Sequence, residues 1–269
     1  MLKKTVLLKI RGAHSGMNPA FKLPSPETGT DYWIYVKPPA PTPAARWPVL
    51  VFLDGDDQYA AGVAAYRDLF AQSVVPPMLL VGVGYGASYA SPANRRGRDY
   101  TPVAHSDEPA SGGAAAFLAF LGTTLWPELI RRYPADPAAR GLAGHSLSSL
   151  FVLYALFQPQ PFFTQHLASS PSIWWAERAM LQQAAELRTR QTVLPAEIFL
   201  SVGSEDTPSM TGDLALLEAQ LTSQPFAGLK IIQRRFSKRN HFNVLPIAFA
   251  TGLSALFGSG GPAPRSLAG

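Results

Sequence analysis

The chain of 269 residues contains no cysteine, few charged residues and no long uninterrupted apolar run. The absence of cysteine excludes disulfide bonds, thiol nucleophiles and cysteine-ligated zinc. Because no apolar run approaches the roughly 18 residues that span a bilayer, we expect no transmembrane helix. Charged residues make up 15% of the chain and hydrophobic residues 47%, which excludes a disordered polar chain and favours a sheet buried on both faces.

The N-terminal residues do not follow the pattern of a secretory signal. A short apolar run begins after Lys4 and ends at Lys9, and neither a long apolar stretch nor an A-x-A site follows. We therefore expect a cytoplasmic protein, with a periplasmic or secreted location as the alternative. The net charge is +5 and the pI is near 9.5. Since Lys and Arg are spread along the chain, a basic enzyme is favoured over a protein that binds nucleic acid.

Strand-like and helix-like segments alternate along most of the chain. Short apolar runs typical of buried strands lie at 32–36, 48–53, 78–83, 141–143, 166–168, 197–202 and 229–236. Segments with the length and composition of helices lie at 60–71, 113–133, 147–157, 177–188, 212–222 and 246–257. This alternation predicts a single α/β domain over 1–257, with a mostly parallel central sheet and helices on both faces. Residues 258–269 are small, polar and proline-containing, and we expect them to form a flexible tail.

Two connections between these elements differ from short turns. Residues 39–48, PAPTPAARWP, form a proline-rich segment that we expect at the surface before the first central strand. The segment 84–109 is long, weakly periodic and rich in Gly, Ser, Arg and Tyr. In a compact domain a connection of this length predicts a functional loop or a partial lid.

The sequence GHSLS at 144–148 lies between a strand-like run and a helix-like run. It is close to the nucleophile elbow G-x-S-x-G, in which small residues allow a sharp turn that presents the serine hydroxyl. Ser148 stands where that motif has its last glycine, and a residue of this size can still pack there. The following helix would direct backbone N–H groups and its dipole toward a developing oxyanion. We therefore interpret Ser146 as a nucleophile.

A serine hydroxyl needs a base, and the base needs an acid that orients it. Of the five histidines, His241 follows a strand-like run and precedes the last helix, where this architecture places its base. A surface histidine in a basic loop is the alternative interpretation. Asp206 follows the end of another strand and is our choice for the acid, with Glu205 the close alternative. The order serine, acid, histidine is that of an α/β-hydrolase, although ordinary loop acidity would also explain either carboxylate.

Two backbone N–H groups are needed to stabilise an oxyanion. The first candidate is the N–H group of Leu147, directly after the proposed nucleophile. The second is that of Asp56 in the loop 54–57, where Gly55 permits a tight backbone. The acidic residues of this loop could also suggest a metal site, but no histidine lies near them in the sequence. We interpret the loop as a turn and expect neither a metal ion nor a cofactor.

Basic and aromatic side chains near these positions could bind substrate. Arg95, Arg96 and Arg98 could hold an anionic or phenolate-bearing group through bidentate hydrogen bonds. They could equally pin the long loop by pairing with Asp99 or Asp107. Trp174 and Trp175 follow a predicted strand, and they could form an aromatic wall for an acyl or aromatic group or could pack beneath a loop.

Six short stretches carry a resemblance to a known family: LDGD at 53–56, RGRDYTP at 96–102, GHSLS at 144–148, SPSIWW at 170–175, GSED at 203–206 and NHF at 240–242. Their order and spacing resemble those of the α/β-hydrolase esterases that include esterase D, the enterochelin-type siderophore esterases and the mycolyltransferases. RGRDYTP and SPSIWW look most like the siderophore-esterase branch. The resemblance implies a cofactor-free carboxylic ester hydrolase with Ser146 as nucleophile, His241 as base and Asp206 or Glu205 as acid. It implies trilactone catecholate siderophores as one substrate class and simple acyl esters as another.

The sequence therefore predicts a serine carboxylic ester hydrolase that works through an acyl-enzyme on siderophore-type, aromatic or short acyl esters. An acyltransferase with the same three residues is one alternative. A non-catalytic protein that keeps the fold and binds an anionic ligand through Arg95, Arg96 and Arg98 is another, and peptide hydrolysis is also compatible with these residues. The expected partner is a small-molecule ester rather than a nucleic acid, and the oligomeric state is left open.

Overall fold

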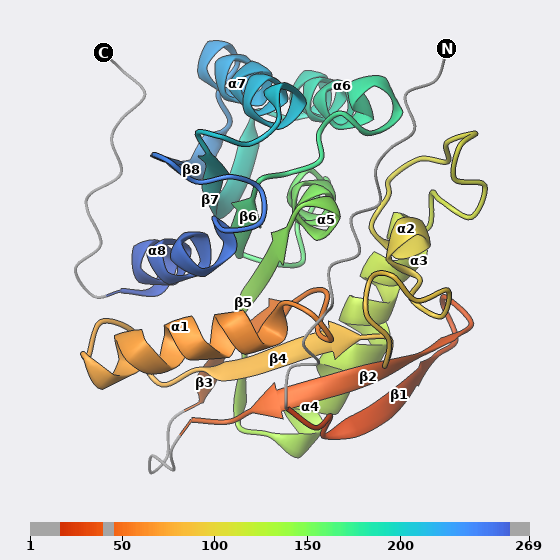
Figure 1. Ribbon diagram of the computed structural model, residues 1–269, viewed down its shortest axis with the longest axis vertical. Helices are drawn as coiled ribbons and strands as arrows, with labels where there is room; N and C mark the ends of the chain where they lie inside the picture. The colour runs from red at the N-terminus through yellow and green to blue at the C-terminus, as the bar shows by residue number, and fades with distance from the viewer. Residues whose placement is uncertain (1–16, 40–45, 259–269) are drawn as a thin grey trace.

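The apolar runs form an eight-stranded sheet at the centre of the computed structural model, which describes residues 17–39 and 46–258 (Figure 1). The strand order is β1-β2-β4-β3-β5-β6-β7-β8. β2 pairs antiparallel with β1 and with β4, and the remaining neighbours are parallel, so the prediction of a mostly parallel sheet is confirmed. The strands are β1 (Phe21–Ser25), β2 (Thr30–Lys37), β3 (Trp47–Phe52), β4 (Leu79–Gly84), β5 (Ala135–His145), β6 (Gln165–Ser169), β7 (Val193–Gly203) and β8 (Ala227–Phe236).

Helices cover both faces of the sheet, as the alternation of elements predicts (Figure 1). Side chains of β3 alternate between two cores, because successive residues of a strand point to opposite faces: Val49 and Val51 enter one core, Leu50 and Phe52 the other. The Phe52 core includes side chains of α1 (Tyr59–Ala71) and α8 (Leu245–Phe257). The opposite core includes side chains of α3 (Ala114–Ala119), η1 (Phe120–Leu125), α4 (Trp126–Arg132), α5 (Leu147–Leu156), α6 (Trp175–Arg190) and α7 (Pro208–Ser223).

Four local features differ from the sequence prediction. The edge strand β1 was not predicted, and the expected helix 113–133 is divided into α3, the π-helical segment η1 and α4. The long segment 84–109 contains a short helix, α2 (Arg96–Asp99). At the beginning of α6, residues 176–178 have left-handed backbone angles, with φ of 45°, 56° and 67°. The last two features lie beside the candidate site described below.

The carboxyl ends of the central parallel strands meet at one edge of the sheet. Hydrogen bonds connect the residues that follow these ends, from Leu53 N–H to the Ala143 carbonyl (2.9 Å), from Ser146 N–H to the Ser169 carbonyl (3.0 Å) and from Ser170 N–H to the Ser201 carbonyl (2.7 Å). The loops after β3, β5, β6 and β7 are therefore held side by side. These loops carry most of the site residues predicted from the sequence.

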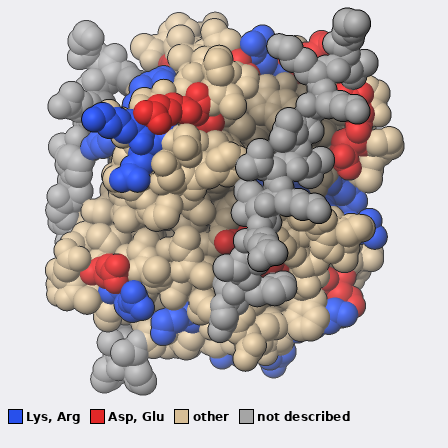
Figure 2. Space-filling view, viewed as in Figure 1, with Lys and Arg blue, Asp and Glu red and all other residues tan. Residues whose placement is uncertain are grey.

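Charged side chains of both signs are mixed on one face of the described residues (Figure 2). On the face shown in Figure 2, Lys and Arg side chains lie in small groups interspersed with Asp and Glu rather than in one continuous basic surface. Within the two described ranges, no helix combines the length and the apolar composition needed to cross a membrane. The predicted connection 39–48 and tail 258–269 lie largely outside the described residues.

Candidate active site

Ser146 lies on a sharp turn between β5 and α5. Its backbone has φ 64° and ψ −123°, and its carbonyl accepts the N–H groups of Ser149 (3.0 Å) and Leu150 (3.2 Å) as the helix begins. Gly144 makes the turn possible, since a Cβ atom there would lie 2.7 Å from the carbonyl carbon and oxygen of Ser148. A non-glycine residue with positive φ in a tight strand-to-helix turn is the backbone geometry of a nucleophile elbow.

Ser148, which replaces the last glycine of the motif, contributes to this turn. Its Oγ accepts a hydrogen bond from the His145 N–H group (3.0 Å) and donates one to the His145 carbonyl (2.8 Å). The side chain is fully buried. The hydroxyl thereby hydrogen-bonds both backbone groups of His145 within the turn, so the departure from the motif is compatible with the elbow.

The side chains of Ser146, His241 and Asp206 form a hydrogen-bonded chain. His241 Nε2 lies 2.9 Å from Ser146 Oγ, and His241 Nδ1 lies 3.1 Å from each carboxylate oxygen of Asp206. Oδ1 of Asp206 also accepts the N–H group of Thr207 at 2.8 Å. Burial raises the pKa of Asp206, but the hydrogen bond and charge of His241, together with the hydroxyl of Ser170 and the N–H group of Thr207, lower it, and the pKa lies below its ordinary value. A carboxylate that stays ionised fixes the imidazole with its basic Nε2 directed at the serine.

The structure corrects the alternative choice of acid. Glu205 is exposed, and among the described residues its carboxylate forms no hydrogen bond or ion pair, while its N–H group donates to the Arg239 carbonyl (2.8 Å). The turn after β7 directs consecutive side chains apart, so only Asp206 faces His241. Asp206 is 8% exposed, which reduces the screening of its interaction with the imidazole.

A second histidine packs against His241. The imidazole of His145 lies 4.7 Å from that of His241, measured between ring centroids, and its Nδ1 lies 3.1 Å from Ser169 Oγ. Burial, together with the neighbouring His241, lowers the pKa of His145 to about 3. His145 is therefore neutral near pH 7. In the sequence, the position of His145 directly before Ser146 is the signal that could have identified it as a site residue.

The N–H groups of Leu147 and Asp56, the two candidates for the oxyanion site, have no hydrogen-bond partner among the described residues. They belong to the loops after β5 and β3, which are neighbouring parallel strands. Gln58 connects the loops, because its Nε2 donates to the carbonyl of His145 at 3.3 Å. The side chain of Asp56 accepts three hydrogen bonds, from Tyr35 Oη at 2.7 Å, from Tyr85 N at 2.6 Å and from Gly86 N at 3.1 Å.

The arginine cluster mainly holds the segment 84–109 in place. Arg96 forms a bidentate ion pair with Asp54, with Nε and Nη2 at 2.9 and 3.0 Å from the two carboxylate oxygens. Nε of Arg98 lies 2.7 Å from Asp99. Arg95 is exposed, and no ion pair to a described acid is found for it. Of the two sequence interpretations, loop pinning is the one that the contacts support, with Asp54 in place of the expected Asp107.

Ser146 opens into a cavity of about 320 Å³. The residues lining it are Asp57, Gln58, Tyr89, Arg96, His145, Ser146, His241, Phe242 and Leu245. Arg96 is thus the one member of the arginine cluster that borders this cavity, where its guanidinium lies 4.5 Å from the ring centroid of Tyr89. Trp174 and Trp175 line a separate cavity. Among the residues that the structure describes, His, Asp and Glu side chains form no group of three that could hold a metal ion.

Comparison with solved structures identifies the class of protein. A BES protein from Bacillus cereus superposes with a TM-score of 0.78 at 27% identity, over 94% of this chain and 97% of that one. The enterobactin and salmochelin hydrolase IroE superposes with a TM-score of 0.69 at 23% identity, over 88% of this chain and 93% of that one. Together with the sheet order, these likenesses define an α/β-hydrolase fold, as the sequence predicted.

Comparison of sequences then identifies the family. The model of the family described as "Putative esterase" matches residues 25–235, so the chain belongs to this esterase family. A ferri-bacillibactin esterase, BesA from Bacillus subtilis, is 29% identical over 277 aligned positions, 93% of this chain and 95% of that protein. A siderophore triacetylfusarinine C esterase from Aspergillus fumigatus is 35% identical over 142 positions, 51% of this chain and 48% of that protein. The protein is a carboxylic ester hydrolase of the siderophore-esterase kind, and the resemblance stated from the sequence is confirmed.

Proposed function

We propose that the protein cleaves carboxylic esters through an acyl-enzyme formed on Ser146. The observation that carries this proposal is the hydrogen-bonded chain from Ser146 Oγ to His241 and Asp206, with 2.9 Å between Oγ and Nε2. His241 Nε2 accepts the Oγ proton while Oγ attacks the ester carbonyl carbon. Asp206 holds the imidazole and stabilises its charged form.

The free N–H groups of Leu147 and Asp56 accommodate the negative charge that develops on the carbonyl oxygen. As the tetrahedral intermediate collapses, the bond between the carbonyl carbon and the alcohol oxygen breaks and His241 protonates the leaving alcohol. Water then attacks the acyl-enzyme with His241 again as base, which releases the acid and restores the Ser146 hydroxyl. In this scheme each proton that His241 accepts is returned within the same half-reaction, and no cofactor takes part.

For the substrate, we propose a siderophore ester. The support comes from the relatives, whose names assign them ferri-bacillibactin, triacetylfusarinine C and salmochelin as substrates. The three names have a siderophore ester in common and differ in the siderophore, so the relatives point to this class of ester rather than to one molecule. Simple acyl esters remain suitable assay substrates, because chemistry at Ser146 requires only an activated carbonyl.

Hydrolysis of p-nitrophenyl butyrate by the wild type and by Ser146→Ala tests the proposal. We expect turnover in the wild type and a loss of about 10⁴-fold or more in the variant, with an unchanged circular dichroism spectrum. Ser223→Ala, an exposed serine at the end of α7, is the matched control and should keep full activity. A fluorophosphonate probe should label the wild type and the control but not Ser146→Ala. Labelling or turnover that survives in Ser146→Ala would refute the assignment of the nucleophile.

A transfer reaction uses the same intermediate and is separated by its products. With an added alcohol, a hydrolase yields mainly free acid, whereas an acyltransferase yields the new ester. We expect free acid to dominate. A predominance of the new ester at millimolar alcohol would assign the protein to the acyltransferase alternative instead.

A further inference from the structure

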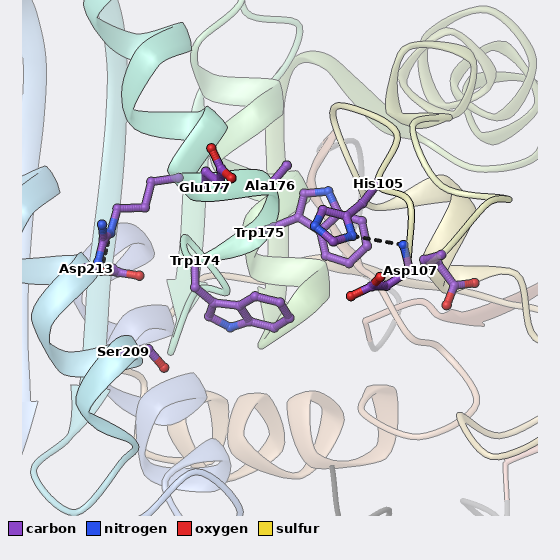
Figure 3. Close-up of a pocket in the computed structure, with 10 residues that line it drawn as sticks. His105, Asp107, Trp174, Trp175, Ala176, Glu177, Ser209 and Asp213 are labelled. Atoms are coloured by element: carbon purple, nitrogen blue, oxygen red, sulfur yellow. Dashed lines mark hydrogen bonds and ion pairs between the residues drawn. The ribbon is translucent and has the colours of Figure 1, made fainter. Parts of the chain in front are cut away.

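A second and larger cavity, of about 700 Å³, lies on the same edge of the sheet as Ser146. The segment 105–108, the beginning of α6 and the beginning of α7 form its walls. Figure 3 shows Trp174 between Asp213 on one side and Asp107 on the other. This volume suits a substituent of moderate size rather than a single ion.

Backbone contacts place this cavity next to the Ser146 site. The Trp175 N–H group donates to the Ser172 carbonyl (3.2 Å), and the Ser172 N–H group in turn donates to the Ser146 carbonyl (3.3 Å). On the other wall, Ser209 lines the cavity and follows Asp206 by three residues. A substrate with its ester carbonyl at Ser146 therefore has this cavity within the same group of loops.

Carboxylates dominate the lining of the cavity. Asp107, Glu108, Glu177 and Asp213 belong to it, and Arg178 is the single arginine or lysine among the described lining residues. The guanidinium of Arg178 is already paired, because its Nε lies 2.7 Å from Asp213 Oδ1. An anionic ligand would meet a net negative field here, whereas a cation would be attracted.

Asp213 supplies an acceptor without a donor. The residue is 2% exposed. Its Oδ1 accepts from Arg178, but its Oδ2 is buried and receives no hydrogen bond within the described part of the chain. Buried carboxylate oxygens are normally hydrogen-bonded, so an unpartnered one in a cavity wall is suited to receive a donor from a ligand. A primary ammonium offers three such donors.

An exposed aromatic ring completes the lining. Trp174 is 45% exposed, unusual for this side chain, and its ring centroid lies 6.0 Å from that of Trp175. Trp175 is fixed in turn, since its Nε1 donates to the Val103 carbonyl (3.1 Å) and its ring lies 5.5 Å from that of His105. Tryptophan faces attract ammonium groups through the ring quadrupole. The left-handed turn 176–178 follows the two tryptophans directly, and all three of its residues line the cavity.

We propose that this cavity is a binding subsite for a cationic group, a primary ammonium, carried on the acyl or alcohol part of the ester that is cleaved at Ser146. The inference rests on the proposed function and adds to it a selectivity for esters that carry an ammonium group. The ammonium group donates to Asp213 Oδ2 and lies against Trp174, with Glu177 and Asp107 adding attraction at longer range. Esters whose substituents are anionic are disfavoured at this subsite.

The test compares three series of p-nitrophenyl esters with acyl chains of increasing length, ending in an ammonium, a methyl or a carboxylate group. At the optimal length, we expect the wild type to prefer the ammonium ester over the carboxylate ester by about tenfold or more in kcat/KM, since a charged hydrogen bond contributes at least this factor. The preference should decrease with added salt. Asp213→Asn and the exposed-site variant Glu177→Gln should each lower the ratio of the two kcat/KM values. Glu186→Gln, an exposed acid on α6 that is absent from the lining, should keep it.

The outcomes separate this inference from the proposed function. Equal kcat/KM values for ammonium and carboxylate esters at every chain length, or the same ratio in all variants, would overturn the cationic subsite while leaving the esterase assignment intact. A wild type that hydrolyses none of the three series would instead contradict the proposed function. Because Glu177 is exposed, Glu177→Gln keeps the test valid even if Asp213→Asn fails to fold.

Discussion

The substitution Asp206→Asn tests whether this carboxylate, and not its neighbour, orients His241. Asp206 Oδ1 accepts the Thr207 N–H group at 2.8 Å, so an asparagine in the same position would keep its carbonyl oxygen there. The amide nitrogen would then occupy the place of Oδ2, 3.1 Å from His241 Nδ1. An N–H group facing Nδ1 requires the imidazole proton to sit on Nε2, which faces Ser146.

That tautomer cannot accept the proton of Ser146. The variant should therefore fold normally and lose about 10⁴-fold in kcat, equivalent to about 5.5 kcal/mol of transition-state stabilisation. The KM value should change little, because Asp206 is buried behind His241 and is not part of the cavity lining. Turnover of p-nitrophenyl butyrate, with the thermal midpoint as a check on folding, measures both quantities.

Glu205→Gln is the matched control for this prediction. It removes a carboxylate one residue away that is exposed and does not contact His241, so activity should remain within about twofold of wild type. The reasoning would be refuted if Asp206→Asn kept more than about a tenth of the wild-type kcat, or if Glu205→Gln lost as much activity as Asp206→Asn.

Two further predictions concern stability. Arg96→Met leaves the carboxylate of Asp54, which is 1% exposed, without its cation. The variant should lower the free energy of unfolding in urea by about 3–5 kcal/mol, whereas Arg95→Ala at the exposed neighbouring position should change it by less than about 0.5 kcal/mol. Equal effects of the two substitutions would show that the ion pair does not hold the loop. Burial lowers the pKa of His166 from 6.5 to about 4. Between these two pH values the unfolded chain binds a proton at His166 that the folded chain does not. The wild type should therefore lose stability as the pH falls below 6.5. His166→Leu should make the protein more stable than wild type at pH 5 relative to pH 7 by about 2 kcal/mol, and parallel pH profiles of the two proteins would contradict this account.

The elements with strong periodicity could be predicted from the sequence, and the exceptions have local causes. β3 and β4 are almost entirely apolar because both faces of the sheet are covered, and this signal is unambiguous. β1 alternates between intermediate and exposed positions and contains Pro24, so nothing in its composition marks it as a strand. The left-handed turn at 176–178 reads Ala-Glu-Arg, residues that favour a right-handed helix. No local pattern in the sequence therefore predicts this conformation.

For the candidate site, chain order was sufficient to bring Ser146 and His241 together, because parallel strands present their carboxyl ends at one edge. The choice between Asp206 and Glu205 depends on the direction that each side chain takes in the turn after β7, which sequence does not specify. The ion-pair partner of Arg96 could not be predicted from the sequence either, since Asp54 lies 42 residues away and two other acids are nearer in the chain. The sequence left substrate binding and loop pinning open for the arginines, and the ion pairs of Arg96 with Asp54 and of Arg98 with Asp99 support loop pinning.

The hydrogen bonds of the Asp56 side chain order the loop after β3 before any substrate binds. Its three accepted hydrogen bonds fasten the loop after β3 to β2 and to the residues after β4, so the proposed oxyanion donor at its N–H group is held in position in the absence of any substrate. These hydrogen bonds form as the chain folds, so the loop is ordered during folding and not again in each catalytic cycle. Successive catalytic cycles begin from a polar environment that does not have to rearrange, so the rate of the acylation step should depend little on solvent viscosity.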